Sequence, residues 1–193
     1  SGPIHDLFSL DKGGVHFLIE HEIATHQFKR ELVESTGQSS RSLAEQVARV
    51  QAHQATLPCT LLHGDAHVGN TYKTSGGERG YLDFQLSARG FCMHDVSYTI
   101  VTSLSVQDRR QHERDLINGY REKLIGLGVH APPSLDALFE EHRRTMAWNL
   151  YIGWLTSPTE NYGWEITVGN LIRLATAYRD LDSAKAIAGL PEQ

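Results

Sequence analysis

His63-Gly-Asp-Ala-His-Val-Gly-Asn70 places two imidazoles, a carboxylate and an amide within eight residues, and Asp83-Phe-Gln85 follows thirteen positions after its end. A short apolar segment precedes each polar stretch: Thr60-Leu61-Leu62 precedes the first and Gly80-Tyr81-Leu82 the second. Apolar runs of this length are typical of short strands, and the polar residues that follow them lie in loops. The pattern predicts a functional site at the ends of two strands.

Two of three interpretations leave part of this stretch unexplained. In the simplest, the polar side chains only satisfy backbone groups of a loop, which does not account for so many functional groups in eight positions. In the second, His63, Asp65 and His67 alternate along a strand and bind zinc or iron, as in a metal-dependent hydrolase. That alternative gives no role to Asn70 and Asp83.

The third interpretation, phosphoryl transfer, gives each polar group a role. Asp65 precedes Asn70 by five positions, and Asp83 then opens a D-F-x turn, which is the order found in protein kinases. The loop carboxylate orients the acceptor hydroxyl and accepts its proton, and the other two side chains offer Mg²⁺ the hard oxygen ligands that it prefers. A turn at Ser75-Gly-Gly77 would fold the second strand back beside the first and bring the three side chains together.

The same residues resemble a known family of small-molecule kinases. The loop H-G-D-x-x-x-x-N at 63–70, with Leu82-Asp-Phe-Gln85, is similar to that of the aminoglycoside/choline-kinase-type phosphotransferases, where protein kinases have H-R-D. His94-Asp-Val-Ser-Tyr98 and Gly119-Tyr-Arg-Glu-Lys-Leu124 are most similar to the ecdysteroid-kinase-like branch. The resemblance is specific over residues 58–128.

The resemblance implies an enzyme that transfers phosphate from ATP, with Mg²⁺, to a hydroxyl of a small molecule. It also implies a mainly α (α+β) fold, a protein-kinase-like C-lobe in which a helical bundle carries a small β-hairpin with the catalytic and metal loops. Carried over to this sequence, Asp65 is the catalytic base, and Asn70 and Asp83 are the Mg²⁺ ligands. The supporting residues are His63, His67 and Asp95.

The sequence contains no counterpart of the N-terminal lobe that the resemblance implies. No G-x-G-x-x-G phosphate loop occurs, and the residues before the first predicted helix are too few for a five-stranded sheet. We therefore expect residues 1–193 to be a single domain, the C-lobe of a longer kinase, since the sequence also lacks an initiator Met. The missing N-lobe would be its partner, and the isolated chain would be inactive. The alternatives are a natural stand-alone lobe and a non-catalytic pseudokinase or scaffold domain.

The composition suits a soluble domain without nucleic-acid or membrane partners. Hydrophobic residues make up 40% and charged residues 21% of the chain, enough for a core and a hydrated surface. A net charge of −5 argues against binding through nucleic-acid phosphates, and no apolar run is long enough to cross a bilayer. With two cysteines and no signal peptide, a cytoplasmic location is expected.

Apolar periodicity predicts leading helices before residue 58, loops and strands over 58–92, and C-terminal helices over 93–193. Residues 1–13 are predicted to be an irregular lead-in, and Gln85–Phe91 a polar loop. Ser42 and Glu45 have the spacing of a capping box. The helices are expected at 15–34, 42–57, 95–103, 106–127, 134–155 (with Ser134 as N-cap) and 165–188.

Aromatic residues of the last helices are candidates for the acceptor pocket, which the resemblance places among C-lobe helices. Their rings could stack on a sugar or another ring, or hold a quaternary amine, with Glu160 and Asp180 as partners of a cationic group. Ordinary packing between helices is the stronger explanation for each residue taken singly, and the sequence does not select a substrate. The candidates are Trp148, Tyr151, Trp154, Tyr162 and Trp164.

Overall fold

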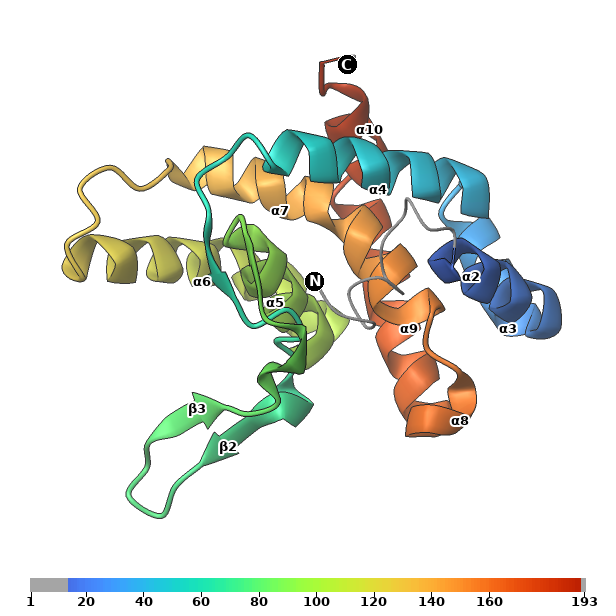
Figure 1. The fold of residues 1–193 in the computed structure, drawn as a ribbon, viewed down its shortest axis with the longest axis horizontal. Helices are drawn as coiled ribbons and strands as arrows, with labels where there is room; N and C mark the ends of the chain where they lie inside the picture. The colour runs from blue at the N-terminus through green and yellow to red at the C-terminus, as the bar shows by residue number, and fades with distance from the viewer. Residues whose placement is uncertain (1–13, 192–193) are drawn as a thin grey trace.

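Helices make up most of the structure, a computed structural model that describes residues 14–191 (Figure 1). Within this range, four short strands form two separate two-stranded antiparallel sheets. The prediction of a mainly helical chain with a small β element is confirmed, whereas the predicted lead-in at 1–13 lies outside the described residues. In chain order the elements are α2 (Gly14–Thr25), α3 (Gln27–Ser35), α4 (Ser40–Gln54), β1 (Thr60–Leu62), the 3₁₀ turn η2 (Val68–Asn70), β2 (Thr71–Lys73), β3 (Arg79–Tyr81), the 3₁₀ turn η3 (Phe84–Leu86), β4 (Ala88–Gly90), α5 (Met93–Ser103), α6 (Val106–Gly126), α7 (Leu135–Leu150), the π-helical turn η4 (Tyr151–Leu155), α8 (Thr159–Tyr162), α9 (Trp164–Asp180) and α10 (Ser183–Ala188).

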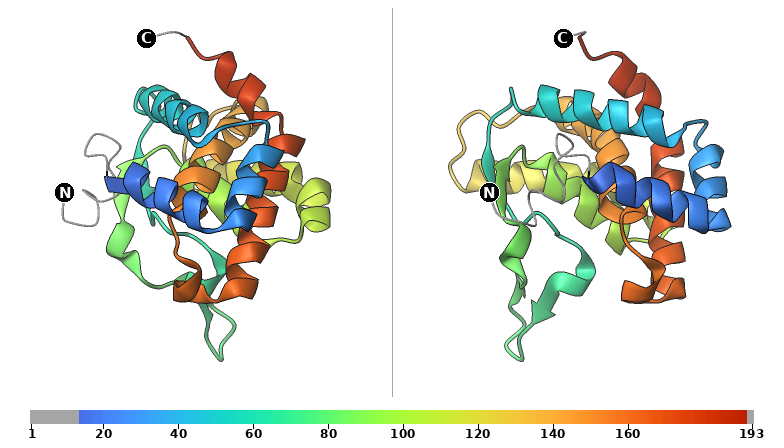
Figure 2. Two further views of the ribbon diagram at one scale, coloured as in Figure 1. Left: turned by 90° about the vertical axis from the view of Figure 1, so that its right-hand side faces the viewer. Right: turned by 45° about the vertical axis from the view of Figure 1, so that its right-hand side comes forward.

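Helix α7 is the central element of the helical body and packs against α4, α5, α6, α9 and α10 (Figures 1 and 2). It begins after the predicted N-cap Ser134, whose hydroxyl accepts a hydrogen bond of 3.1 Å from the backbone N–H of Ala137. Its side chains Met146 and Leu150 are fully buried in the main core, together with Val47 of α4. Burying an apolar side chain of this size contributes about 1.5–3 kcal/mol to the free energy of folding. The buried residues of α7 therefore contribute strongly to the stability of the core. In the described residues no helix is both long and apolar enough for a membrane span.

The prediction of one helix over 15–34 is wrong, because the helix is interrupted at His26, between α2 and α3. His26 has an extended backbone, with φ −114° and ψ 104°. The hydroxyl of Thr25 donates to the carbonyl of His21 at 2.7 Å, and Nδ1 of His26 lies 3.2 Å from the carbonyl of Glu22. Side chains that bond carbonyls of the last turn in this way compete with continuation of the helix.

The predicted helix over 165–188 is also divided into two. Asp182 lies between α9 and α10 with φ 50°, in the left-handed region. The guanidinium of Arg143 on α7 donates to the carbonyl of Leu181 at 2.7 Å, which takes the place of the helical hydrogen bond lost at the break. The interruption therefore depends on a contact 38 residues away in sequence, which periodicity alone does not reveal.

The predicted capping box of α4 is wrong by three residues. Ser39 is the N-cap: its hydroxyl accepts from the N–H of Ser42 at 3.1 Å, and the N–H of Ser39 donates to the Ser42 hydroxyl at 2.9 Å. Glu45 instead lies 3.1 Å from the Arg41 guanidinium on the exposed side of the helix. A serine can complete the box because its hydroxyl reaches the same backbone group as a longer carboxylate.

The strands pair differently from the prediction. The hairpin turn at 75–77 is present, and β2 pairs with β3 around it, with Thr71 opposite Tyr81. Strand β1, however, pairs with β4, with Leu62 opposite Ala88, so part of the predicted polar loop at 85–91 is a strand. Gly90 permits this pairing, because a Cβ there would lie only 2.7 Å from Leu62 Cδ1.

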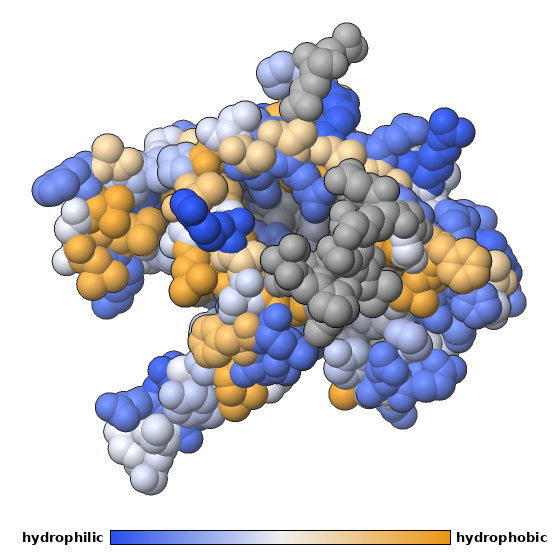
Figure 3. Space-filling model, in the orientation of Figure 1, coloured by the Kyte–Doolittle hydropathy of each residue, from blue (hydrophilic) through white to orange (hydrophobic). Residues whose placement is uncertain are grey.

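The β2–β3 hairpin projects from the helical body (Figure 2). Figure 3 shows apolar surface at its base and polar surface at its tip. Apolar residues exposed in these segments include Leu61, at 74%, with Leu82 at 45% and Phe84 at 56%. Solvent-exposed apolar side chains therefore lie on β1 and in the segment after β3, next in sequence to the polar loops.

Candidate functional site

Asp95, in the first turn of α5, fixes the start of the loop that follows β1. One carboxylate oxygen accepts from the backbone N–H of His63 at 2.6 Å, and the other accepts from the N–H of Gly64 at 3.1 Å. Hydrogen bonds to a charged acceptor are about twice as strong as neutral ones. Asp95 therefore attaches the loop at 63–70 directly to the helical body.

His63 joins this loop to the second polar segment. Its Nδ1 accepts from the N–H of Asp65 at 3.2 Å, so Nε2 carries the proton that it donates to the carbonyl of Leu82 at 2.9 Å. Both ring nitrogens are thus used within the protein. Among residues 14–191, no three His, Cys, Asp or Glu side chains are arranged to hold a metal ion. The alternative zinc or iron site on His63, Asp65 and His67 is therefore contradicted.

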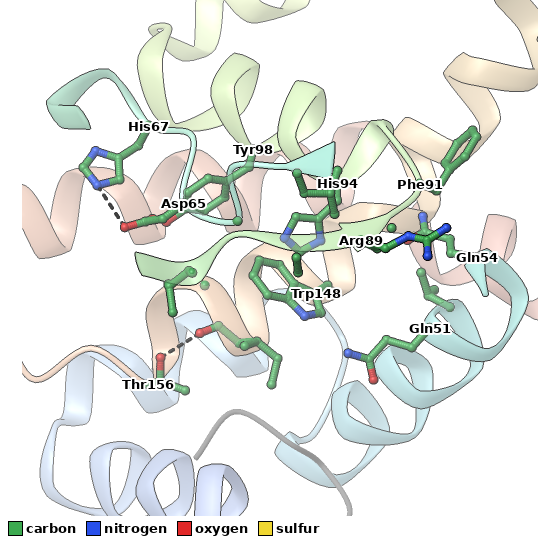
Figure 4. A pocket seen from close by; sticks show the side chains of 18 of the residues that line it. Gln51, Gln54, Asp65, His67, Arg89, Phe91, His94, Tyr98, Trp148 and Thr156 are labelled. Atoms are coloured by element: carbon green, nitrogen blue, oxygen red, sulfur yellow. Dashed lines mark hydrogen bonds and ion pairs between the residues drawn. The ribbon is translucent and has the colours of Figure 1, made fainter. Parts of the chain in front are cut away.

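Asp65 and Asn70 are in direct contact. The Asn70 amide nitrogen donates to the Asp65 carbonyl at 3.0 Å and to its carboxylate at 3.2 Å. His67 contacts the same carboxylate: its Nδ1 accepts from the N–H of Gly69 at 3.0 Å, which leaves the proton on Nε2, 3.5 Å from Asp65 (Figure 4). The 3₁₀ turn η2 between Asp65 and Asn70 makes both contacts geometrically accessible.

These contacts keep Asp65 ionised. Burial of the carboxyl on its own opposes the charge, but the hydrogen bond and charge of His67, the Asn70 amide and the His63 ring outweigh burial and lower the pKa of Asp65. At neutral pH the group is thus a carboxylate that can accept a hydrogen bond or a proton.

Asp83 lies at the end of the hairpin, close to the same group. The N–H of Leu82 donates to the carbonyl of Asn70 at 2.9 Å, which sets the two loops side by side. Asp83 itself is exposed and has a left-handed backbone, with φ 64° and ψ 63°. Burial raises the pKa of the Tyr162 phenol, and the negative charges of Asp65 and Asp83 both add to this rise. The charges of the two carboxylates therefore act on the same phenol.

A pocket of about 550 Å³ opens beside Asp65 (Figure 4). Its walls come from α4, the β1 loop, β4, α5 and the segment from α7 to α8. The rings of His94 and Trp148 meet in its wall with centroids 4.1 Å apart. Asp65 belongs to the lining, whereas Asn70 and Asp83 do not. The pocket thus includes the predicted base but not the two predicted metal ligands.

The structure places the predicted pocket residues in two groups. Trp148, Trp154 and Tyr162 line the cavity with Asp65. Tyr151 is instead buried in the main core, where its hydroxyl lies 2.9 Å from Nδ1 of His16. Trp164 lies edge-on to Phe28, with ring centroids 5.1 Å apart. Neither of the last two residues reaches the cavity.

Several residues of the pocket were not expected from the sequence. His94 directly precedes Asp95, so its position next to the loop follows from a segment already singled out. Gln51 and Gln54 on α4, and Arg89 on β4, have the pattern of ordinary hydrated positions. Only the pairing of β4 with β1 brings Arg89 to this cavity, and that pairing was not predicted.

Gly64 is expected to be indispensable for the loop geometry. Its φ is +87°, and a Cβ would lie 2.1 Å from the Leu86 carbonyl oxygen, which is a backbone atom. We expect Gly64→Ala to destabilise the fold by more than about 1–2 kcal/mol in urea unfolding, since left-handed strain and the clash add. Gly119→Ala is the matched control, because Gly119 is helical and nothing lies within 4 Å of its added Cβ. Equal stability of the two variants would contradict the strained geometry.

Comparison with known families gives one match. The sequence model of the ecdysteroid kinase-like family matches residues 16–128, more than half of the 193 residues. The matched region contains the 63–70 loop, Asp83 and Asp95, whereas the aromatic residues of the pocket from Trp148 onward lie beyond it. Neither the curated proteins nor the solved structures contain a significant match.

Proposed function

The chain belongs to the ecdysteroid kinase-like family, and we propose that it is the catalytic C-lobe of an ATP- and Mg²⁺-dependent phosphotransferase that acts on a hydroxyl of a small molecule. The observation that carries this proposal is the direct contact of the Asn70 amide with the ionised Asp65, in a loop that the backbone hydrogen bond from Leu82 to Asn70 joins to the segment of Asp83. Family membership alone supports a kinase-like phosphotransferase.

In this proposal Asp65 positions the acceptor. Its carboxylate accepts a hydrogen bond from the attacking hydroxyl and takes the proton as the new oxygen–phosphorus bond forms. Asn70 and His67 hold the carboxylate in one orientation, and His63 and Asp95 hold the loop. The reaction therefore depends on positioning, for which a loop tied at several points is well suited.

Asn70 and Asp83 are suited to hold Mg²⁺ with the nucleotide phosphates. Because the Asn70 amide nitrogen donates to Asp65, its side-chain oxygen is left without a donor among residues 14–191. The Asp83 carboxylate is exposed, and its only hydrogen bond within the described part of the chain is a long one of 3.4 Å from Gln85. One amide oxygen and one carboxylate match the few protein ligands that Mg²⁺ takes at phosphate sites. An Mg²⁺ ion held by Asn70 and Asp83 would supply positive charge beside the transferred phosphoryl group.

The composition of the cavity lining supports different binding positions for the acceptor and the nucleotide. The cavity contains Asp65 but neither Asn70 nor Asp83, so we assign it to the acceptor, and the region of Asn70 and Asp83 to the nucleotide. The exposed Leu61 on β1, together with the exposed Leu82 and Phe84 after β3, supports the proposal that a second, nucleotide-binding lobe packs against these segments.

The proposed metal site is tested by Asp83→Asn in the full-length protein. Asparagine tolerates the left-handed backbone at this position, so the substitution removes one charge without new strain. We expect the Mg²⁺ concentration for half-maximal ATP-dependent phosphorylation of a hydroxylated acceptor to rise by at least about tenfold. Asp115→Asn, at an exposed position on α6, should leave it unchanged. No ATP consumption by the wild-type protein with any hydroxylated acceptor would instead favour a non-catalytic domain.

A further inference from the structure

We propose that the acceptor is a flat, ring-containing compound with an anionic group, such as a carboxylate, at the end remote from its reacting hydroxyl. This inference rests on the proposed function, because it assumes that the hydroxyl lies at Asp65. It is carried by Arg89, a cation that lines the same cavity as Asp65. In Figure 4 the two residues lie on opposite sides of the pocket.

Arg89 has no acidic partner within the described chain. Every salt bridge among residues 14–191 uses another arginine, a lysine or a histidine. Asp65 is the single carboxylate among the described lining residues, and the ion pair and hydrogen bonds around it are already made by His67 and Asn70. Arg89 is solvent-exposed at the pocket wall and has no hydrogen-bond acceptor among residues 14–191, so its guanidinium is free to bind a planar carboxylate in two-pronged fashion.

The wall next to Arg89 is polar but carries no uncompensated charge. Gln54 lines the cavity, and its amide nitrogen donates to Thr145 at 2.9 Å and to Glu141 at 3.3 Å. Glu141, behind this wall, is already paired with His53 at 2.8 Å and with Arg144. Glu141, the acid that contacts Gln54, is therefore paired with other cations and not with Arg89.

Between Asp65 and Arg89, aromatic side chains line much of the cavity. His94 and Trp148 form one wall, with Tyr98 edge-on to Trp148 at a centroid distance of 6.3 Å. Burial lowers the pKa of His94, against the opposing charge of Asp95, so its ring is neutral at pH 7 and adds no second cation. Such walls favour a ring that stacks on them, and about 550 Å³ accommodates a fused bicyclic compound.

The same contacts argue against a cationic acceptor. Asp180, a candidate partner for a cation, is already bound to Arg109 and Arg110 and does not line the cavity. A cation at the remote end would also meet Arg89.

The test measures binding of three matched probes without nucleotide: 6-hydroxy-2-naphthoate, its neutral amide, and the cationic 6-(aminomethyl)-2-naphthol. By calorimetry we expect the carboxylate to bind the protein about tenfold more tightly than the amide, and the amine most weakly. Arg89→Gln should remove the advantage of the carboxylate and leave the amide unchanged. Arg79→Gln, at an exposed arginine of β3 outside the cavity, is the matched control and should change none of the three affinities.

Equal binding of the three probes, tightest binding of the amine, no binding of the carboxylate, or an unchanged preference in Arg89→Gln would each overturn the inference. The binding assay contains neither ATP nor Mg²⁺. Its result can therefore be interpreted even if the protein does not transfer phosphate. Conversely, phosphorylation of neutral or cationic acceptors would support the proposed function while contradicting the anionic acceptor.

Discussion

Asp65→Asn is expected to lower the rate of phosphoryl transfer by about 10²–10⁴-fold and to leave the fold intact. Asparagine keeps the shape of the side chain and an oxygen that can still accept from Asn70, but it cannot take the proton of the acceptor hydroxyl. The measurement is kcat/KM of the full-length protein, with circular dichroism as the check on folding. Asp115→Asn, on the exposed side of α6, is the matched control and should be as active as the wild type.

The pH profile gives an independent readout of the same residue. Because His67 and the other contacts lower the pKa of Asp65, the carboxylate stays ionised as the pH falls from about 7 to about 5. We therefore expect no acidic loss of kcat/KM in that range from this group, and a loss only below its ordinary value. Full activity of Asp65→Asn, or an acidic limb near pH 6 that this variant removes, would contradict the assignment.

The loop could be predicted from the sequence because its geometry is almost entirely local. Asp65 and Asn70 are five residues apart and meet through one 3₁₀ turn, and Asp83 follows them across a single hairpin. Glycine at position 64 fits because its backbone has φ +87°. A short segment with so few degrees of freedom has few ways to place its polar groups, and the pattern of residue types then identifies the chemistry.

The pocket could not be predicted because it is assembled from distant segments. Trp148 and His94 meet because α7 packs against α5, and Tyr151, in the π-helical turn that follows α7, lies in the main core. Arg89 reaches the cavity through a strand pairing that the polar character of 85–91 concealed. Periodicity shows which side of a helix is apolar, but it does not show which neighbour covers that side.

The same distinction explains the errors at the helix boundaries. The break at His26 and the one at Asp182 lie inside segments whose composition is compatible with a continuous helix. What ends the helices are specific hydrogen bonds to backbone carbonyls, one of them from Arg143 on another helix. Such bonds change the boundary without changing the apolar pattern from which a helix is inferred.

Asp95→Ala is expected to destabilise the protein by about 2–4 kcal/mol and to reduce phosphoryl transfer by more than the lost stability explains. The substitution leaves the N–H groups of His63 and Gly64 without their acceptor, and each unpaired buried donor costs about 1–3 kcal/mol. The loop that carries Asp65 would then be released from α5, so its carboxylate would no longer be held toward the acceptor.

Asp136→Ala is the matched control for this variant. Asp136 and Asp95 both lie in the first turn of a helix, so both variants lose the favourable interaction with the helix dipole, about 0.3–1 kcal/mol. The Asp136 side chain is 86% exposed and contacts only Arg114 at the surface, so it holds no loop. Hydrogen exchange should therefore accelerate at the amides of His63 and Gly64 in Asp95→Ala and stay slow there in Asp136→Ala. Equal destabilisation and unchanged exchange in both variants would mean that α5, rather than the carboxylate of Asp95, positions the loop.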